Sequence, residues 1–296
     1  MRSHRLRERM SGEIWGLEGG LLREKDDGLA TSIPGAAPEE APSAARIYDY
    51  LLGGYHNFEV DRAVARQFVG ILPRAPFIMR ANRAFVRRVV GLLVDQGVDQ
   101  FLDVGSGIPT VGNVHEIAQG LNPAARVVYV DMDPVAVRHS EEILKGNPNT
   151  AVIQADVRDP RAILEHPEVS RLLDLGRPVA VLIASVLLFL PDDEEAYRVV
   201  GALRDALAPG SYLCISHATT EGASREEVED SVKLYAATGN PMKLRSRAQI
   251  EEFFHGLEFL EPGLVFLPLW RPEDPDDLYY DEPHLAGNLG AVGRKP

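Results

Sequence analysis

A regular alternation of short apolar runs and helical segments, starting near residue 100, limits this chain to few folds. Runs such as QFLDV, RVVYVD and VAVLIASV have the character of buried strands, and stretches such as PVAVRHSEEILKG separate them. A βαβ unit takes about 30 residues, and the runs end 25 to 32 residues apart, at Asp103, Asp131, Asp156, Ser185 and His217. This spacing predicts an α/β fold with a mostly parallel sheet and helices on both faces.

Composition divides the chain into three predicted parts. Residues 1–42 are rich in Gly, Pro and Ala without periodicity, so we expect a disordered or loosely attached extension. Residues 43–98 have helical periodicity, and residues 99–296 carry the strand and helix repeat. Near the end, the proline-rich acidic stretch PEDPDDLYYDEP separates two strand-like pieces, which predicts an antiparallel edge.

Composition also excludes several classes of function. The net charge of −13 opposes nonspecific binding to nucleic acid. No apolar run is long enough for a membrane span and the N-terminus lacks the apolar core of a signal peptide, so we expect a cytoplasmic protein that binds no membrane. The only cysteine, Cys214, rules out an internal disulfide, and the eight histidines show no metal-binding spacing, so we predict no metal site.

The loop FLDVGSGIPT after the first strand resembles the start of a nucleotide-binding loop. Gly105 and Gly107 allow a tight turn and close approach of a ligand to the backbone. A dinucleotide needs glycines that lead directly into a helix N-terminus, where free N–H groups meet the pyrophosphate. Here Pro109, which has no N–H, follows instead, and the third glycine is missing. The loop therefore suits a ligand without a pyrophosphate, such as S-adenosylmethionine (SAM).

The ends of the next strands agree with SAM. Asp131 follows Gly107 by 24 residues, where a carboxylate can accept hydrogen bonds from the ribose hydroxyls. Met132 can lie against the adenine, and Asp156 can accept from its amino group. Asp133 and Pro134 indicate a helix start, with Asp133 as the N-cap.

The sequence also resembles a family of SAM-dependent methyltransferases that occurs mainly in actinobacteria and was long known only as a domain of unknown function. The resemblance spans residues 43–296 and rests on ARIYDYLLGGYHNFEVDR, RANRAF, QFLDVGSGIPTVGNVHE, VYVDMDP, QADVRDP, LRDALAPGSYLCISHAT and GAVGRKP. It implies the seven-stranded Rossmann-like class I sheet with an antiparallel last strand. Two residues depart from the family pattern: Met132 replaces an asparagine, and Leu188 replaces a histidine on the reaction side of the cofactor.

Together, motif and resemblance assign a set of cofactor-binding residues. The segment ARIYDYLLGGYHNFEVD, with Gly53 and Gly54 among aromatic residues, is interpreted either as a hinged lid over the cofactor or as a plain helix–turn–helix. Arg80, Asn82 and Arg83 are candidates for the methionine carboxylate. The predicted cofactor-binding residues are Tyr48, Arg83, Asp103, Gly105, Ser106, Gly107, Asn113, Asp131, Met132, Asp156, Val157 and Ser185.

Methyl transfer from a sulfonium needs alignment and exclusion of water more than it needs a nucleophile from the protein. A general base matters only if the accepting atom must lose a proton. His217, at the end of the fifth strand, is the predicted catalytic base, and His56 and Tyr235 are further candidates. His115, just after the glycine loop, could face the ligand.

The main hypothesis is a SAM-dependent methyltransferase that acts on a small-molecule acceptor, with secondary metabolism as one setting. Leu188 motivates an alternative, a SAM-binding sensor or partner module without activity. A nicotinamide-linked oxidoreductase is a third hypothesis, against which the missing glycine and Pro109 argue. The acceptor, the methylated element and the oligomeric state stay open.

Overall fold

A computed structural model describes residues 41–109, 112–273 and 280–296. Within these residues the strands form one sheet in the order β3-β2-β1-β4-β5-β8-β6, and β7 also pairs with β8. The predicted extension, residues 1–42, lies outside the described residues except for positions 41 and 42. The strands are β1 (Gln100–Val104), β2 (Arg126–Asp131), β3 (Thr150–Gln154), β4 (Ala180–Ala184), β5 (Tyr212–Ala218), β6 (Glu258–Phe259), β7 (Val265–Phe266) and β8 (Asn288–Arg294).

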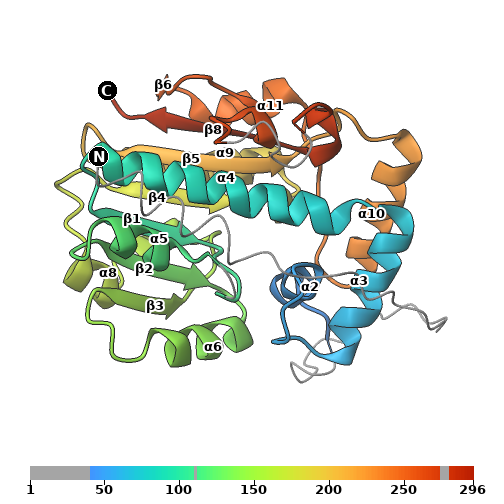
Figure 1. Cartoon of the computed structure of the whole chain (residues 1–296), viewed down its shortest axis with the longest axis horizontal. Helices are drawn as coiled ribbons and strands as arrows, with labels where there is room; N and C mark the ends of the chain where they lie inside the picture. The colour runs from blue at the N-terminus through green and yellow to red at the C-terminus, as the bar shows by residue number, and fades with distance from the viewer. Residues whose placement is uncertain (1–40, 110–111, 274–279) are drawn as a thin grey trace.

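The sheet has the predicted mixture of parallel and antiparallel pairs. Strands β1 to β5 pair in parallel, and β8 runs antiparallel to β5. The two-residue strands β6 and β7 pair with opposite ends of β8. Together they stand where the predicted seven-stranded sheet has its sixth strand. In Figure 1 the arrow of β8 accordingly points against the arrow of β5. The prediction of a mostly parallel sheet with an antiparallel last strand is confirmed.

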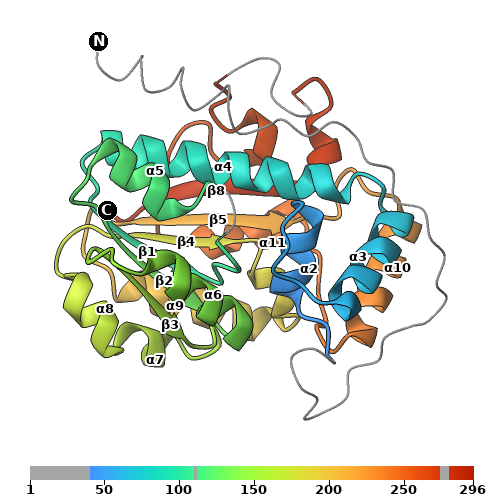
Figure 2. The ribbon, with the colours of Figure 1, turned by 60° about the horizontal axis from the view of Figure 1, so that its bottom comes forward.

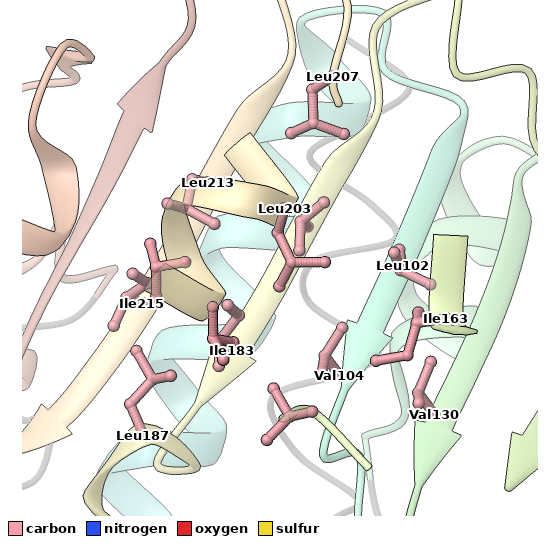
Figure 3. Close-up of a cluster of buried hydrophobic side chains, with 14 of the residues drawn as sticks. Leu102, Val104, Val130, Ile163, Ile183, Leu187, Leu203, Leu207, Leu213 and Ile215 are labelled. Carbon is pink, nitrogen blue, oxygen red and sulfur yellow. The ribbon is translucent and has the colours of Figure 1, made fainter. Parts of the chain in front are cut away.

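Helices cover both faces of this sheet because strand residues alternate between two apolar clusters. Phe101 packs with α4 and α5, whereas the next residue, Leu102, packs with α7, α8 and α9 on the other face. Figure 3 shows part of the second cluster, in which Leu102 and Val104 of β1 lie near Ile163 of α7. The longer helices are α2 (Ala44–Leu51), α3 (Glu59–Ile71), α4 (Ala75–Asp95), α5 (Val114–Leu121), α6 (Pro134–Leu144), α9 (Asp193–Asp205) and α10 (Arg225–Ala237), and the short ones are α7 (Pro160–Leu164), α8 (Pro167–Leu172) and α11 (Arg247–Glu251).

Among the described residues there are also four short 3-10 helices, and no helix there is long and apolar enough to cross a membrane. The 3-10 helices are η1 (Leu187–Phe189), η2 (Glu252–Phe254), η3 (Leu267–Leu269) and η4 (Pro283–Ala286).

Three helices, α2, α3 and α10, gather beyond the carboxyl ends of the parallel strands. Figures 1 and 2 both show them at the end of the sheet toward which the arrows of β4 and β5 point. A third apolar cluster joins these helices to the loop after β4, with Ile47, Phe68, Leu188 and Tyr235 among its members. We call α2, α3 and α10 the helical layer. The region predicted as helical, residues 43–98, contains α2, α3 and α4.

Candidate functional site

A cavity of about 610 Å³ lies between the carboxyl ends of the strands and the helical layer. Its size falls within the range of small-molecule sites. In open α/β sheets ligands bind in this position, outside the carboxyl ends of the strands. The predicted cofactor residues among its lining are Tyr48, Arg83, Asp103, Gly105, Ser106, Gly107, Asp131, Met132, Val157 and Ser185.

The glycine loop after β1 fits closely against the rest of the site. Gly105 and Gly107 have φ angles of 71° and 65°, a region that favours glycine. A Cβ on Gly105 would come within 2.3 Å of the Val186 side chain, so that position admits no larger residue without movement. The N–H of Gly107 donates to Oδ2 of Asp131 at 2.7 Å. The loop is thereby tied to the carboxylate at the end of β2.

Asp131 is a buried carboxylate that only backbone groups hold. Besides the contact with Gly107, its Oδ1 accepts from the N–H of Asp133 at 2.9 Å. Burial raises the pKa of the Asp131 carboxyl to about 6, and the backbone hydrogen bonds oppose that rise. The side chain of Met132 is 59% exposed at the cavity edge. Asp133 caps α6 as predicted, with its Oδ1 accepting from the N–H of Val135.

Asp103, near the end of β1, is a second buried acid in the cavity wall. Burial raises the pKa of its carboxyl to about 7, the positive charge of Arg83 opposes this, and the nearby Asp131 adds to it. Arg83 lies on α4 and donates from Nη2 to the carbonyl of Gly112 at 3.2 Å. The pairing of an acid with an arginine at one end of the cavity suits the amino and carboxylate groups of an amino acid.

A chain of polar side chains crosses the carboxyl ends of β4 and β5 and the amino end of β8. Asn288 donates from Nδ2 to Oγ of Ser185 at 2.9 Å, and the hydroxyls of Ser185 and Ser216 are 3.5 Å apart. Ser216 donates to Oδ1 of Asn82 at 2.5 Å, and Asn82 donates to the Tyr48 hydroxyl at 3.1 Å. Ser185 has a φ of 57°, which is rare for a residue other than glycine. Strained residues of this kind cluster at functional sites.

Two predicted cofactor residues lie outside the cavity wall. Asn113 caps α5 together with Glu116, and its Oδ1 accepts from Arg83 at 3.4 Å. Asp156 stands between two lining residues, but its carboxylate binds the backbone and guanidinium of Arg158. Asn113 lies behind the cavity wall, where its contact with Arg83 can orient the arginine side chain.

The structure places His217, the predicted catalytic base, away from the cavity. Its ring is fully buried and does not line the cavity. Nδ1 lies 2.7 Å from the carbonyl of Ala218, Nε2 lies 2.9 Å from Nη1 of Arg245, and the ring stacks on Phe253. Burial lowers the pKa of the imidazole to about 4. The neighbour Ser216 faces the cavity side instead, because successive strand residues point to opposite faces.

Sequence reasoning missed Arg245, which holds the wall that carries Leu188. This arginine is fully buried and donates to the carbonyls of Leu187 and Leu190 at 2.9 and 2.7 Å. Its Nε also pairs with Asp193 at 2.9 Å. Nothing in the local sequence RSRAQ distinguishes Arg245, its first residue, as a buried arginine, since most arginines are exposed. Sequence reasoning also missed Asn288 and Ser216. Polar residues occur in the strands of many sheets and do not by themselves indicate a functional site.

The corner between α2 and α3 contains the Gly53–Gly54 motif. Asp49 accepts at Oδ2 from the N–H of His56 and the amide of Asn57, while its Oδ1 is buried without a hydrogen bond to any described residue. A Cβ on Gly54 would come within 2.0 Å of that oxygen. The His56 ring lies 4.2 Å from that of His139 on α6. The corner therefore packs on the α6 side of the sheet domain.

Among the candidate bases, only Tyr235 lines the cavity. His56 belongs to the corner just described, and His115 binds the Tyr129 hydroxyl through Nδ1 at 2.8 Å. Across the residues that the structure describes, no group of three or more His, Cys, Asp or Glu side chains could hold a metal ion.

The sequence was compared with known proteins. The family model described as S-adenosyl methyltransferase matches residues 35–296. A solved structure from Thermobifida fusca YX, named as a candidate methyltransferase, is 43% identical with a TM-score of 0.80 and covers 86% of this chain and 95% of its own. A DUF574 family protein from Streptomyces avermitilis MA-4680 is 41% identical with a TM-score of 0.82 and covers 87% of this chain and 99% of its own. No functionally curated protein matches the sequence.

The match spans most of the chain and includes every residue of the cavity wall. The cavity fits SAM, because positive-φ glycines leave room beside the backbone and two buried carboxylates stand at neighbouring strand ends. Both similar structures come from actinobacteria, as the sequence motifs predicted. The chain belongs to the S-adenosyl methyltransferase family and is a SAM-dependent methyltransferase.

Proposed function

We propose that this methyltransferase acts on a small, largely apolar acceptor that enters the cavity on the side of the helical layer. One observation carries the proposal: a single cavity joins the polar strand ends to an apolar wall. Enclosed apolar cavities with a few polar groups are typical of small-molecule sites. The net charge of −13 favours such an acceptor over nucleic acid. A cytoplasmic location and a setting in secondary metabolism belong to the same proposal.

The polar half of the cavity would hold SAM. In our proposal Asp131 accepts from the ribose hydroxyls, and Met132 and Val157 lie beside the adenine. Asp103 faces the amino group of the methionine part, and Arg83 faces its carboxylate. SAM supplies an activated methyl group on a positively charged sulfur.

The chain contributes alignment and exclusion of water. Holding two reactants in the reactive geometry lowers a barrier by about 7–11 kcal/mol. Asn82 and Arg83 of α4 and Ser185, which follows β4, are buried or half-buried. The polar chain from Asn288 to Tyr48 limits the movement of Asn82 and Ser185. Because the helical layer stands opposite the strand ends, an acceptor bound between them would be partly shielded from water.

Calorimetric titration with SAM and its product S-adenosylhomocysteine tests the cofactor half. We expect micromolar binding that Asp131→Ala weakens strongly. Asp99→Ala is the matched control, because Asp99 pairs with Arg126 and Arg177 at the opposite end of the sheet. Absence of binding to the folded protein would refute the proposal. Release of S-adenosylhomocysteine with a panel of small acceptors then tests the second half.

Leu188 supports the alternative of a SAM-binding module without activity. Its side chain packs in the apolar cluster of the helical layer, where it offers no polar group to an acceptor. SAM binding without turnover of any acceptor would favour this alternative. The nicotinamide-linked hypothesis has no such support, because α5 begins only at Val114, several residues after Gly107.

A further inference from the structure

We infer that the methyl acceptor is an apolar organic acid, such as a phenol, thiol or carboxylic acid, that reacts in its ionised form and accepts a hydrogen bond from the Tyr235 hydroxyl. The inference rests on the proposed function, because it concerns the acceptor side of the same cavity. It names the chemical class that this wall can bind and methylate.

The acceptor side of the cavity is apolar. It belongs to the cluster that joins α2, α3 and α10 to the loop after β4. A ligand here exchanges water for hydrocarbon, so an apolar body is favoured over a polar one. The side chains that line this part include Leu51, Phe68, Leu72, Leu188, Phe189 and Met242.

No described side chain on the acceptor side can take a proton near neutral pH. The cavity wall contains no histidine, and its carboxylates are Asp103, Asp131 and Asp133, all at the ends of β1 and β2. Asp133 is held by Arg46, and Asp131 by two backbone N–H groups. Asp103 stands beside Arg83. The acceptor atom must therefore have a free lone pair when it binds, without first losing a proton to the protein.

Tyr235 brings a hydroxyl into the apolar wall, where Ser231 and Asn240 also line the cavity. Its ring lies 5.3 Å from Phe68, edge-on, and 5.9 Å from Phe189, the neighbour of Leu188. Its hydroxyl makes no hydrogen bond to a described residue, and the side chain lines the cavity, so the hydroxyl can donate to a bound ligand. Burial raises the pKa of the Tyr235 phenol well above its ordinary value, so it remains a donor. A donor in an apolar wall suits an acceptor atom that is negatively charged.

The change of charge during methyl transfer favours an ionised acid over a neutral amine as the acceptor. In the step, the acceptor's lone pair forms a bond to the methyl carbon, and the carbon–sulfur bond breaks with its electron pair left on sulfur. With an anion, a positive and a negative charge both disappear, which an apolar cavity favours. With an amine, a positive charge passes to the product and stays in the cavity without a carboxylate on the acceptor side, which is costly.

Binding of 4-nitrophenol, which ionises near neutral pH and absorbs visibly as the phenolate, tests the inference. We expect the phenolate to bind the SAM-loaded protein at least tenfold more tightly than the protein loaded with S-adenosylhomocysteine, because only SAM carries the positive sulfur. The neutral amine 4-nitroaniline, of similar size, should bind both forms alike. Loss of the phenolate absorbance at constant pH would report methyl transfer itself.

Tyr235→Phe should weaken phenolate binding about tenfold, since it removes one hydrogen bond to a charged group, and should leave SAM binding unchanged. Tyr197→Phe is the control, because its hydroxyl donates to the carbonyl of Gln249 outside the cavity. Equal or tighter binding of 4-nitroaniline, an unaffected Tyr235→Phe variant, or no probe binding to protein that binds SAM would each overturn the inference. Failure to bind SAM would instead overturn the proposed function.

Discussion

Arg46 of α2 reaches the helix cap at Asp133, with its Nη1 3.1 Å from Oδ2 of that carboxylate. The guanidinium also pairs with Asp61 of α3 at 2.8 Å. The arginine and both acids are buried, and the N–H of Asp133 donates to Asp131. One buried ion-pair network thus links the helical layer to the residue that we assign to the ribose of SAM.

Arg46→Met should destabilise the protein by about 3 kcal/mol, because it leaves two buried carboxylates without their cation. SAM binding should also weaken, since the turn that presents Asp131 loses its anchor. Chemical denaturation and calorimetry measure the two effects. Arg161→Met is the control, because Arg161 pairs with Glu165 on the surface, where such a pair contributes about 0–1 kcal/mol. Similar losses for both variants would contradict a special role of Arg46.

SAM affinity should fall as the pH drops from 8 to 5. The pKa values of Asp103 and Asp131 are about 7 and about 6 in the cofactor-free protein, and binding needs both carboxylates ionised. Below each pKa, protonation weakens binding about tenfold per pH unit. S-adenosylhomocysteine should show the same dependence, because it retains the ribose and the amino group. Calorimetry at several pH values is the measurement, and a constant affinity would contradict both assignments.

Asp103→Asn should stabilise the cofactor-free protein at pH 8 by about 4 kcal/mol while weakening SAM binding. Burial raises the pKa of Asp103 from 3.8 to about 7. The stability linked to its protonated form is complete below pH 4 and is lost as the pH rises to 7. The gain of the variant should therefore shrink toward zero when denaturation is repeated near pH 4. An equal gain at both pH values would rule out ionisation as its cause.

His217→Leu should reduce stability by about 1–3 kcal/mol, because Arg245 loses a buried hydrogen-bond partner. Turnover with any acceptor that the wild-type protein methylates should change less than tenfold. Loss of a general base costs about 10²–10⁴-fold in rate. A loss of that size, with SAM binding intact, would restore His217 as a catalytic candidate.

Gly54→Ala should cost about 2 kcal/mol of stability, because the new methyl group collides with the buried carboxylate of Asp49. Gly70→Ala in α3 is the matched control. A Cβ there meets nothing within 4 Å, and alanine stabilises a helix by about 0.5–1 kcal/mol relative to glycine. Opposite signs for the two variants, measured by denaturation, would confirm the close packing of the α2–α3 corner.

Most of the sheet and the cofactor half of the site could be predicted, because their signals are local. The alternation of apolar runs gives the strands, and the carboxyl ends of parallel strands meet at one edge, so Asp103 and Asp131 had to lie close together. The Asp133-Pro134 pair identified the start of α6 for the same reason. The split of the sixth strand position into β6 and β7 was not predictable from such short segments.

His217 shows where local patterns become insufficient. Its place at the end of β5 was correct, but a shift of one residue decides which face a strand side chain takes. Ser216 turned toward α4 and the cavity, and His217 turned toward Phe253. Only the packing of helices on each face distinguishes the two sides.

By itself, the sequence determined the order of strands and helices, the glycine loop and the acids at the strand ends, because each depends on neighbouring residues. Tertiary structure decided that Arg46 reaches Asp133, that Arg245 is buried under the wall of Leu188, and that Tyr235 lines the cavity. These contacts join segments 50 or more residues apart. Long-range packing brings such groups together, and the periodicity of the sequence does not predict which groups will meet.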